Sequence, residues 1–255
     1  MTEILKISNG QLEVLVHPRG AELQVLKNLE TGINHMWSGD AAFWDKHSPI
    51  LFPIVGTLKD NTYRYNGRAY TLPRHGFARE RTFLAEHVSE EALNFRLVDD
   101  AETREIYPFH FQLDLHYRLE GNRLYCRYTV TNTGEDPLLF SIGGHPAFAV
   151  PLKPEQESYE DYYLVFSDSH ELQRYKVING LIGDETELIR LEAGRLPLTR
   201  ELFREDALVL KGMPDQEISL LSSRHGHGLH FHFEDFPYFG IWAVPGADFV
   251  CLEPW

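Results

Sequence analysis

The stretch FHFQLDLHYRLEGNRLYCRYTVTN, residues 109–132, decides the fold class. Apolar and polar side chains alternate along both of its halves, and Glu120-Gly121-Asn122 interrupts the alternation in the middle. A period of two is typical of a half-buried strand, because successive side chains of a strand point to opposite faces. The stretch therefore predicts two long strands joined by a tight turn.

The same device recurs toward the N-terminus. Asn9-Gly10 and Asn66-Gly67 each separate two short alternating runs. An Asn-Gly step fits the positive φ values of a type I′ turn, so both positions predict β-hairpins.

The second half of the chain continues the strand pattern, with alternating apolar residues over 217–244. Helical periodicity is not sustained anywhere, and residues 40–48 and 199–206 predict at most short helical turns. With no internal repeat and no linker, we expect one all-β domain over residues 1–255, a large antiparallel β-sandwich.

The composition of the chain narrows the classes of molecule that it is expected to bind. The 255 residues carry a formal net charge of −14, which disfavours nucleic acid and anionic membranes but not a neutral sugar. The two cysteines form no disulfide framework. The first twenty residues lack the pattern of a signal peptide, and no apolar run is long enough to span a membrane. We expect a cytoplasmic protein.

Two segments place an ionisable side chain at a strand end. In SIGGHPAF, residues 141–148, His145 follows two glycines and precedes a proline. The glycines allow a close approach of the backbone, and the proline favours an extended conformation at His145. PGADFVCLEPW, residues 245–255, ends an apolar strand on Glu253, and removal from water makes a carboxylate a better base. The alternatives are a histidine that caps a turn and a solvated glutamate beyond the last strand.

A third segment, LPRHGFARE at residues 72–80, sets His75 between Arg74 and Arg79. The two arginines suit a sugar hydroxyl, a phosphate or one of the protein's own carboxylates. Read alone, the segment favours a packed histidine in a tight turn over any other role for His75.

Other features have plain structural readings. RHGHGLHFHF, residues 224–233, holds four histidines, but a zinc site needs three ligands in good geometry, so we expect a histidine-rich strand and turn without metal. For Trp44, Trp242 and Trp255, a pocket wall and core packing both remain open. Phosphate-loop, dinucleotide, zincin and serine-hydrolase motifs are missing from the sequence.

Taken in order, five segments resemble the aldose 1-epimerase (galactose mutarotase) superfamily, and its LacX-like branch in particular. They are LFPIVGTLKDNTYRYNG (51–67), LPRHGFARE, SIGGHPAF, DALVL (206–210) and FPYFGIWAVPGADFVCLEPW (236–255). The resemblance implies a β-sandwich of the galactose mutarotase type. It also implies interconversion of the α and β anomers of an aldose, without a metal or an organic cofactor.

The resemblance assigns roles to single residues. His145 matches the general acid that protonates the ring oxygen, and Glu253 matches the base that deprotonates the C1 hydroxyl. His75 matches a histidine that binds and polarises the sugar, and Asp206 a hydroxyl-binding aspartate. Trp242 is a candidate for the apolar face of the sugar.

One position departs from the family pattern. Thr57 stands where members of the group often carry an arginine, and Arg74 or Arg79 could compensate for it. Substrate preference therefore stays open. We expect an epimerase of a free hexose, with a hexose-6-phosphate epimerase and a non-catalytic sugar-binding protein as the alternatives.

Overall fold

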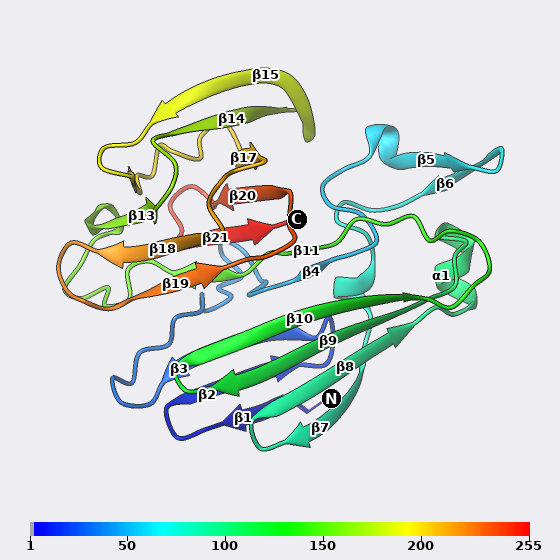
Figure 1. Ribbon diagram of the computed structural model, residues 1–255, viewed down its shortest axis with the longest axis horizontal. Helices are drawn as coiled ribbons and strands as arrows, with labels where there is room; N and C mark the ends of the chain where they lie inside the picture. The colour runs from blue at the N-terminus through cyan, green and yellow to red at the C-terminus, as the bar shows by residue number, and fades with distance from the viewer. Residues whose placement is uncertain (1–2) are drawn as a thin grey trace. The chain divides into compact units, whose positions relative to one another are not determined.

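The hairpin predicted at residues 109–132 forms one side of a four-stranded antiparallel sheet, and its second strand is the edge strand (Figure 1). In the computed structural model, which describes residues 3–255, β9 (Phe111–Glu120) pairs with β10 (Arg123–Asn132) along its whole length. Gly121-Asn122 is the two-residue loop between them. Every second residue of β9, beginning at Phe111, is buried, so the predicted alternation is confirmed.

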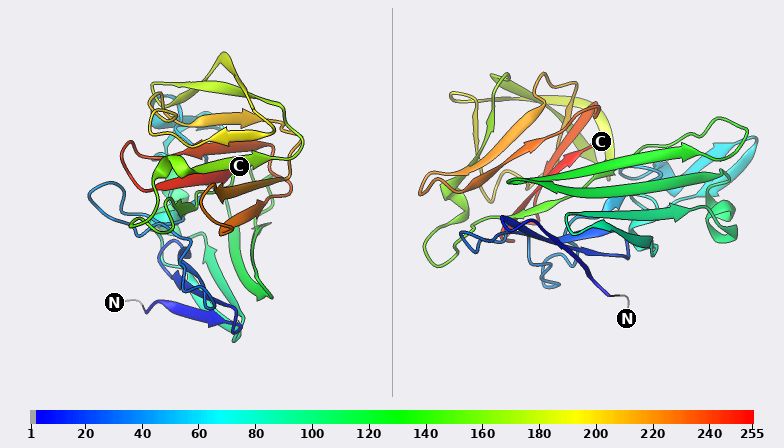
Figure 2. Two further views of the ribbon diagram at one scale, coloured as in Figure 1. Left: turned by 90° about the vertical axis from the view of Figure 1, so that its left-hand side faces the viewer. Right: turned by 60° about the horizontal axis from the view of Figure 1, so that its bottom comes forward.

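The chain divides into two compact units, and the first comprises the chain up to Ile33 together with Ser48–Ile142. Within this unit, a three-stranded sheet, β1-β2-β3, lies against the four-stranded sheet β10-β9-β8-β7 (Figures 1 and 2). The Tyr117 hydroxyl on β9 donates to the Ala21 carbonyl 2.7 Å away and joins the two layers. The other elements of the unit are β1 (Leu5–Ser8), β2 (Leu12–His17), β3 (Glu22–Asn28), β4 (Ile50–Leu51), η1 (Lys59–Asn61), β5 (Thr62–Tyr65), β6 (Arg68–Thr71), η2 (Ala78–Glu80), β7 (Leu84–Ser89), β8 (Ala92–Val98) and α1 (Ala101–Ile106).

The two Asn-Gly hairpins differ in their turns. Asn66 and Gly67 both have positive φ, 47° and 78°, and connect β5 to β6 as a type I′ turn does, so that prediction is confirmed. Of Asn9 and Gly10 only the glycine has positive φ. The Asn9 side chain instead accepts hydrogen bonds from the backbone N–H groups of Gln11 and Leu12, at 3.1 and 2.9 Å. A type I′ turn was the wrong prediction there, because an asparagine side chain can bond the backbone that follows it.

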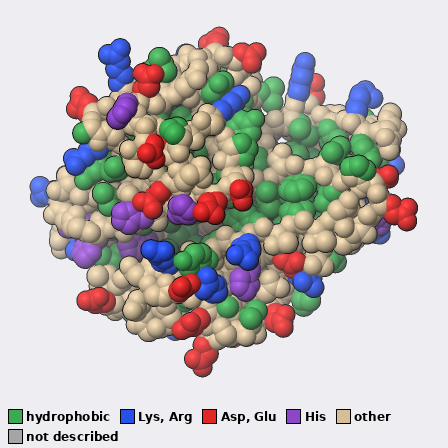
Figure 3. Space-filling model, in the orientation of Figure 1, with side chains coloured by type: hydrophobic (Ala, Val, Ile, Leu, Met, Phe, Trp, Pro, Cys, Tyr) green, Lys and Arg blue, Asp and Glu red, His purple; other side chains and the backbone are tan. Residues whose placement is uncertain are grey.

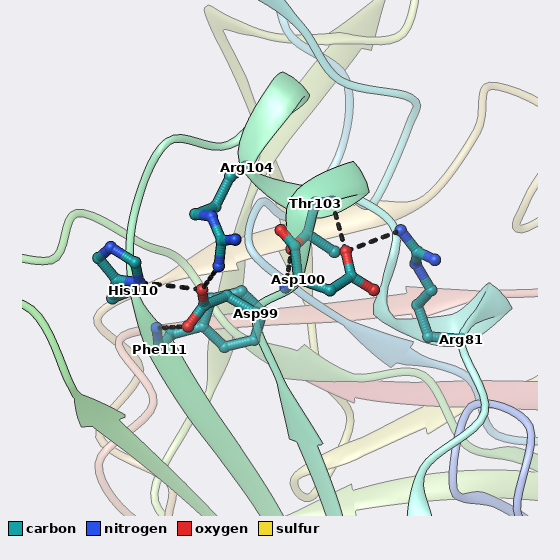
Figure 4. A network of polar contacts seen from close by, with 7 residues as sticks. All are labelled: Arg81, Asp99, Asp100, Thr103, Arg104, His110 and Phe111. Atoms are coloured by element: carbon teal, nitrogen blue, oxygen red, sulfur yellow. Dashed lines mark hydrogen bonds and ion pairs between the residues drawn. The ribbon is translucent and has the colours of Figure 1, made fainter.

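Helix α1 was not predicted, although a capping signal precedes it. Asp100 accepts from the Thr103 N–H at 2.7 Å, and Thr103 Oγ1 accepts from the Asp100 N–H at 2.8 Å (Figure 4). The hydrogen bond from the Thr103 N–H lowers the pKa of Asp100 from its usual 3.8, against the opposing effect of burial, and the charge of Arg81 adds to the lowering. This reciprocal cap starts a six-residue helix.

Asp99, the preceding residue, anchors the strand that follows the helix. Burial alone raises its pKa, but hydrogen bonds from the Phe111 N–H, Arg104 and His110 outweigh burial and lower the pKa below 3.8 (Figure 4). Phe111 N donates at 2.9 Å, and His110 Nδ1 lies 3.0 Å away.

The second unit, Asn34–His47 with Gly143–Trp255, is also built from antiparallel strands. Its two sheets have the orders β12-β21-β20-β17-β14-β15 and β16-β13-β18-β19. Phe231 on β19 packs on Phe148 of β12 and on Phe239 of β20, with ring centroids 5.7 and 6.1 Å apart, and so joins one sheet to the other. The elements are β11 (Gly143–Gly144), β12 (Ala147–Ala149), η3 (Tyr159–Asp161), β13 (Tyr162–Phe166), β14 (Glu171–Ile178), β15 (Leu181–Arg190), β16 (Arg195–Pro197), β17 (Leu208–Lys211), β18 (Glu217–Ser222), β19 (Gly228–His232), β20 (Tyr238–Trp242) and β21 (Phe249–Pro254).

The predicted all-β class is confirmed, and the longest α-helix among the described residues is α1. Residues 40–48 and 199–206 form turns and bends, as expected. Within residues 3–255, no helix has the length and apolarity needed to cross a membrane. On the face drawn in Figure 3, acidic side chains are scattered among basic ones. The single-domain organisation stays a prediction.

Candidate active site

Glu253 lies on a strand that is buried along its entire length. All six residues of β21 are buried, and the strand runs between β12 and β20 in the six-stranded sheet. Its apolar run, Phe249-Val250-Cys251-Leu252, explains this central position. The alternative of a solvated glutamate beyond the last strand is therefore wrong.

His145 reaches Glu253 from the neighbouring chain segment. Ala147 pairs with Cys251, and the Leu252 N–H donates to the Pro146 carbonyl at 3.2 Å. Continued by two residues, this antiparallel register brings His145 level with Glu253. His145 Nε2 and Glu253 Oε1 are 3.3 Å apart, and their side chains are 9% and 4% exposed. The apolar strand expected before His145 is reduced to Gly143–Gly144.

Two tryptophans flank the histidine. The Trp44 ring lies 5.0 Å from the His145 ring at 33°, and the Trp242 ring lies 5.5 Å from it at 81°. The two indoles contact each other edge to face at 5.7 Å. Trp44 and Trp242 are only partly buried. They therefore offer some accessible apolar surface in addition to their contacts with His145.

Two glycines make room for Trp255 beside the pair. A Cβ on Gly240, the residue opposite Glu253, would lie 2.6 Å from Trp255 Cζ2. A Cβ on Gly143 would lie 2.8 Å from Trp255 Cδ1. The first glycine of β11 and the glycine of β20 thus lie against the Trp255 indole, and a larger residue at either position would require the indole to move. For Trp255, the structure supports packing.

Cys251 is the third polar side chain at this place. It points to the same sheet face as Glu253, two residues on, and is fully buried. Burial, with a further contribution from Glu253, raises the pKa of the Cys251 thiol well above 9.0, so the thiol is protonated at neutral pH. The ligand atoms of His145, Cys251 and Glu253 all lie within 4.8 Å of one another, and all three residues are buried.

The histidines of residues 224–233 interact with protein groups. His230 Nδ1 lies 2.7 Å from Ser219 Oγ, and His232 Nε2 lies 3.1 Å from Glu234. His225 pairs with Glu157, whose other oxygen accepts from the Tyr162 hydroxyl at 2.6 Å.

Asp206 precedes β17, two strands from β21 in the same sheet. Its φ is 72°, and its Oδ1 accepts from the Ala207 N–H at 2.8 Å. Buried Arg174 donates to the carbonyls of Glu205 and Asp206, at 2.8 and 3.4 Å. Arg174 was missed by sequence reasoning, because no local motif marks it within the alternating strand β14.

His75 belongs to the first unit, where a main-chain clamp holds it. Its backbone N–H donates to the Gly56 carbonyl at 2.8 Å, and the Gly56 N–H points at His75 Nδ1 from 3.0 Å. Arg74 Nε lies 3.2 Å from His75 Nε2. Two N–H groups thus point at the ring, and a neutral imidazole can accept only one of them, because its other nitrogen carries a proton.

The arginines beside His75 have partners in their own loop. Arg79 Nη2 donates to the Arg74 carbonyl at 2.9 Å, and its Nε lies 3.9 Å from Glu80. Arg79 therefore supports the main chain that carries His75. Thr57 follows the clamping residue Gly56 directly.

The predicted site residues fall into two groups. His145, Glu253 and Trp242 come together in the second unit, and Asp206 lies on another loop of that unit. His75, Arg74 and Arg79 come together in the first. Trp44 and Cys251 were not among the predicted site residues. One of the two open interpretations of Trp44, a pocket wall, would have pointed to that residue. The spacing of two residues between Cys251 and Glu253, which puts both side chains on one face of a strand, would have pointed to Cys251.

Several known proteins are similar to this chain in sequence and in fold. The chain is 33% identical to the chromosomal protein LacX of Lactococcus lactis subsp. lactis, over 98% of this chain and 87% of that protein. The structure of a galactose mutarotase related enzyme from Lactobacillus acidophilus superposes with a TM-score of 0.94 at 32% identity, over 99% and 85% of the two chains. A galactose mutarotase-like protein from Lactobacillus casei gives 0.89 at 34% identity, over 99% and 87%.

These likenesses confirm the predicted β-sandwich of the galactose mutarotase type. Residues 3–255, nearly the whole sequence, match the aldose 1-epimerase family. The chain therefore belongs to the aldose 1-epimerase family.

Proposed function

We propose that the protein is an aldose 1-epimerase that interconverts the α and β anomers of a free hexose. The observation that carries the proposal is the buried pair His145–Glu253, 3.3 Å from nitrogen to oxygen, beside the rings of Trp44 and Trp242. An imidazole and a carboxylate this close can engage the two oxygens that a hemiacetal carries on one carbon.

The reaction needs one proton removed and one added. Glu253 takes the proton of the C1 hydroxyl while His145, in its protonated form, gives one to the ring oxygen. The bond between C1 and the ring oxygen breaks, and an open-chain aldehyde forms. After rotation about C1–C2, the ring oxygen attacks the other face of the aldehyde. His145 recovers its proton from that hydroxyl, Glu253 returns one to the new C1 hydroxyl, and no net proton is consumed.

The remaining predicted residues are proposed to bind the sugar. His75 is assigned to the sugar near the ring oxygen, and the contact of its Nδ1 with the Gly56 N–H fixes the direction of its ring. Asp206 binds a hydroxyl, and Trp242 an apolar face. Arg79 donates a hydrogen bond to the Arg74 carbonyl of its own loop. We therefore favour a free hexose over a hexose-6-phosphate, because this hydrogen bond uses a guanidinium N–H that a phosphate would otherwise accept.

The test follows anomer exchange by NMR for glucose, galactose and glucose-6-phosphate. The wild type is expected to accelerate exchange of a free hexose over buffer, and His145→Asn to lose most of that acceleration while remaining folded.

Three results would change the proposal. Binding of a hexose without faster exchange would point to a sugar-binding protein. Exchange of the phosphate ester alone would point to the phosphorylated substrate. Full activity of His145→Asn would remove the assigned acid.

A further inference from the structure

We propose that His145, Cys251 and Glu253 form a binding site for a thiophilic divalent cation, with Zn²⁺ as the type case, and that the bound cation blocks the acid–base pair. The inhibitory effect rests on the proposed function, whereas the cation site itself does not. The three residues are the one group of three or more histidine, cysteine or acidic side chains that come this close within residues 3–255.

The distances suit the ion. Zinc lies at about 2.0 Å from a histidine nitrogen and a carboxylate oxygen, and about 2.3 Å from a thiolate. Tetrahedral angles then separate the nitrogen and the oxygen by about 3.3 Å, and the sulfur from either of them by about 3.5 Å. His145 Nε2 and Glu253 Oε1 are 3.3 Å apart already, which is one edge of such a tetrahedron. The Cys251 sulfur, within 4.8 Å of both, needs a shift of about 1 Å.

The strand pairing holds the three ligands in register. Cys251 and Glu253 are alternate residues of one buried strand, and His145 stands beside Glu253 on the neighbouring segment. Ligands fixed by a central sheet lose little freedom on binding, which favours the bound state.

Charge and ligand type select the cation. One thiolate, one carboxylate and one neutral imidazole balance Zn²⁺, and the thiol proton leaves to solvent as the ion binds. Sulfur and imidazole favour zinc over Mg²⁺ or Ca²⁺, which prefer oxygen. The net charge of −14 raises the local concentration of cations around the chain.

A bound cation occupies both catalytic groups at once. The lone pairs that Glu253 and His145 need for proton transfer would be engaged by the metal. Sugar and zinc therefore exclude each other at this site, and excess hexose should raise the zinc concentration needed for half inhibition.

The experiment first measures binding without sugar. Titration with Zn²⁺ is expected to give one equivalent bound and a raised melting temperature. Co²⁺ as a spectroscopic substitute should show a sulfur-to-cobalt charge-transfer band. Cys251→Ala should lose the band and weaken zinc binding about tenfold or more. If Cys251→Ala does not fold, Cys251→Ser supplies the same test, because its oxygen cannot give the sulfur band.

Matched variants identify the site. Cys126→Ala removes the exposed cysteine and should leave the band unchanged. The double variant His230→Ala/His232→Ala tests the histidine-rich strand and should also leave it unchanged. The inference is overturned if Cys251→Ala keeps wild-type zinc affinity, or if the band disappears in either control variant.

Activity is measured last, each variant against its own metal-free rate, with Mg²⁺ as the control ion. Anomer exchange that falls with zinc occupancy, and not with Mg²⁺, supports the inference. Exchange that persists at full zinc occupancy overturns the blocking role. A protein that binds zinc through Cys251 but catalyses no exchange keeps the cation site and overturns the proposed function.

Discussion

Each unit of the molecule contains a carboxylate beside a histidine, at nearly the same distance. Asp99 Oδ2 lies 3.0 Å from His110 Nδ1 in the first unit, and Glu253 Oε1 lies 3.3 Å from His145 Nε2 in the second. Their surroundings differ. The His110 side chain is 57% exposed, whereas that of His145 is 9% exposed and adjoins two tryptophan rings.

The difference shows that a short distance between a carboxylate and a histidine does not by itself give the pair the surroundings that acid–base chemistry needs. Asp99 also accepts from Arg104 and from the Phe111 N–H, so its oxygens serve the fold (Figure 4). A carboxylate held by a guanidinium and a main-chain donor is a poor base, because those donors stabilise its ionised form. Glu253 shares a buried site with an imidazole and apolar surface, which suits proton transfer.

The largest expected effect is on the rate of anomer exchange, which should depend on Glu253 and not on Asp99. Glu253→Gln should lower the rate of anomer exchange by about 10²–10⁴-fold, because the amide cannot accept the C1 proton. Asp99→Asn should keep the wild-type rate, measured by NMR under the same conditions. A fully active Glu253→Gln protein would show that another group is the base.

The next effect concerns Gly76, which directly follows His75 in the first unit. A Cβ on Gly76 would lie 2.2 Å from the Phe52 carbonyl oxygen, and its φ is 71°. Gly76→Ala should therefore reduce the free energy of unfolding by about 3–5 kcal/mol, from the clash and the left-handed backbone together. Gly67→Ala is the matched control, since its φ is 78° but nothing lies within 4 Å; it should cost about 1–2 kcal/mol. Equal losses in urea melts would rule out the clash.

The next prediction concerns the hydrogen bonds that Asp99 accepts, which should make the stability of the fold depend on pH. Because the folded-state pKa of Asp99 is lowered, its ionised form stabilises the fold above the unfolded pKa of about 3.9 and loses this effect as pH falls through the folded pKa. Asp99→Asn should cost about 2–3 kcal/mol at pH 7. The difference between the two proteins should shrink below about pH 4. A difference that stays constant down to pH 2.5 would contradict this assignment.

A smaller effect is expected beside Glu253. Gly240→Ala should cost about 1–2 kcal/mol, because the Trp255 indole must move away from the new methyl group. The displaced ring should also lower the exchange rate. Gly226→Ala, with nothing within 4 Å, is the control and should change the rate little. Unchanged stability and rate in Gly240→Ala would mean that Trp255 is not held there.

The smallest effect concerns the arginine of the His75 loop. Arg79→Met should cost about 1 kcal/mol, for the hydrogen bond to the Arg74 carbonyl. The ratio of exchange rates for glucose and glucose-6-phosphate should not change. A selective loss of the phosphate substrate would instead make Arg79 a phosphate ligand.

Sequence patterns predicted some strands of both units, among them β9 and β10, and the Asn66-Gly67 turn, because these depend on local periodicity and on residues that tolerate positive φ. The strands between residues 84 and 98 and between 162 and 197 were not predicted. They did not predict the clamp between His75 and Gly56, since that contact joins residues nineteen apart through main-chain atoms. Helix α1 was missed because six residues carry too little periodicity.

For the site, motif order pointed to His145 and Glu253, but position alone left the exposure of Glu253 open. Its burial follows from the pairing of β21 with both β12 and β20, which no local stretch specifies. Trp44 reaches His145 from a turn a hundred residues earlier, a contact that only the fold reveals.

The distribution of tryptophan gives the protein a built-in optical label. All four tryptophans, Trp37, Trp44, Trp242 and Trp255, belong to the second unit. Indole fluorescence therefore originates in that unit, and Trp44 and Trp242 place two emitters next to His145. A sugar that binds beside them, as proposed, is expected to change their emission, which gives a binding signal that needs no added label.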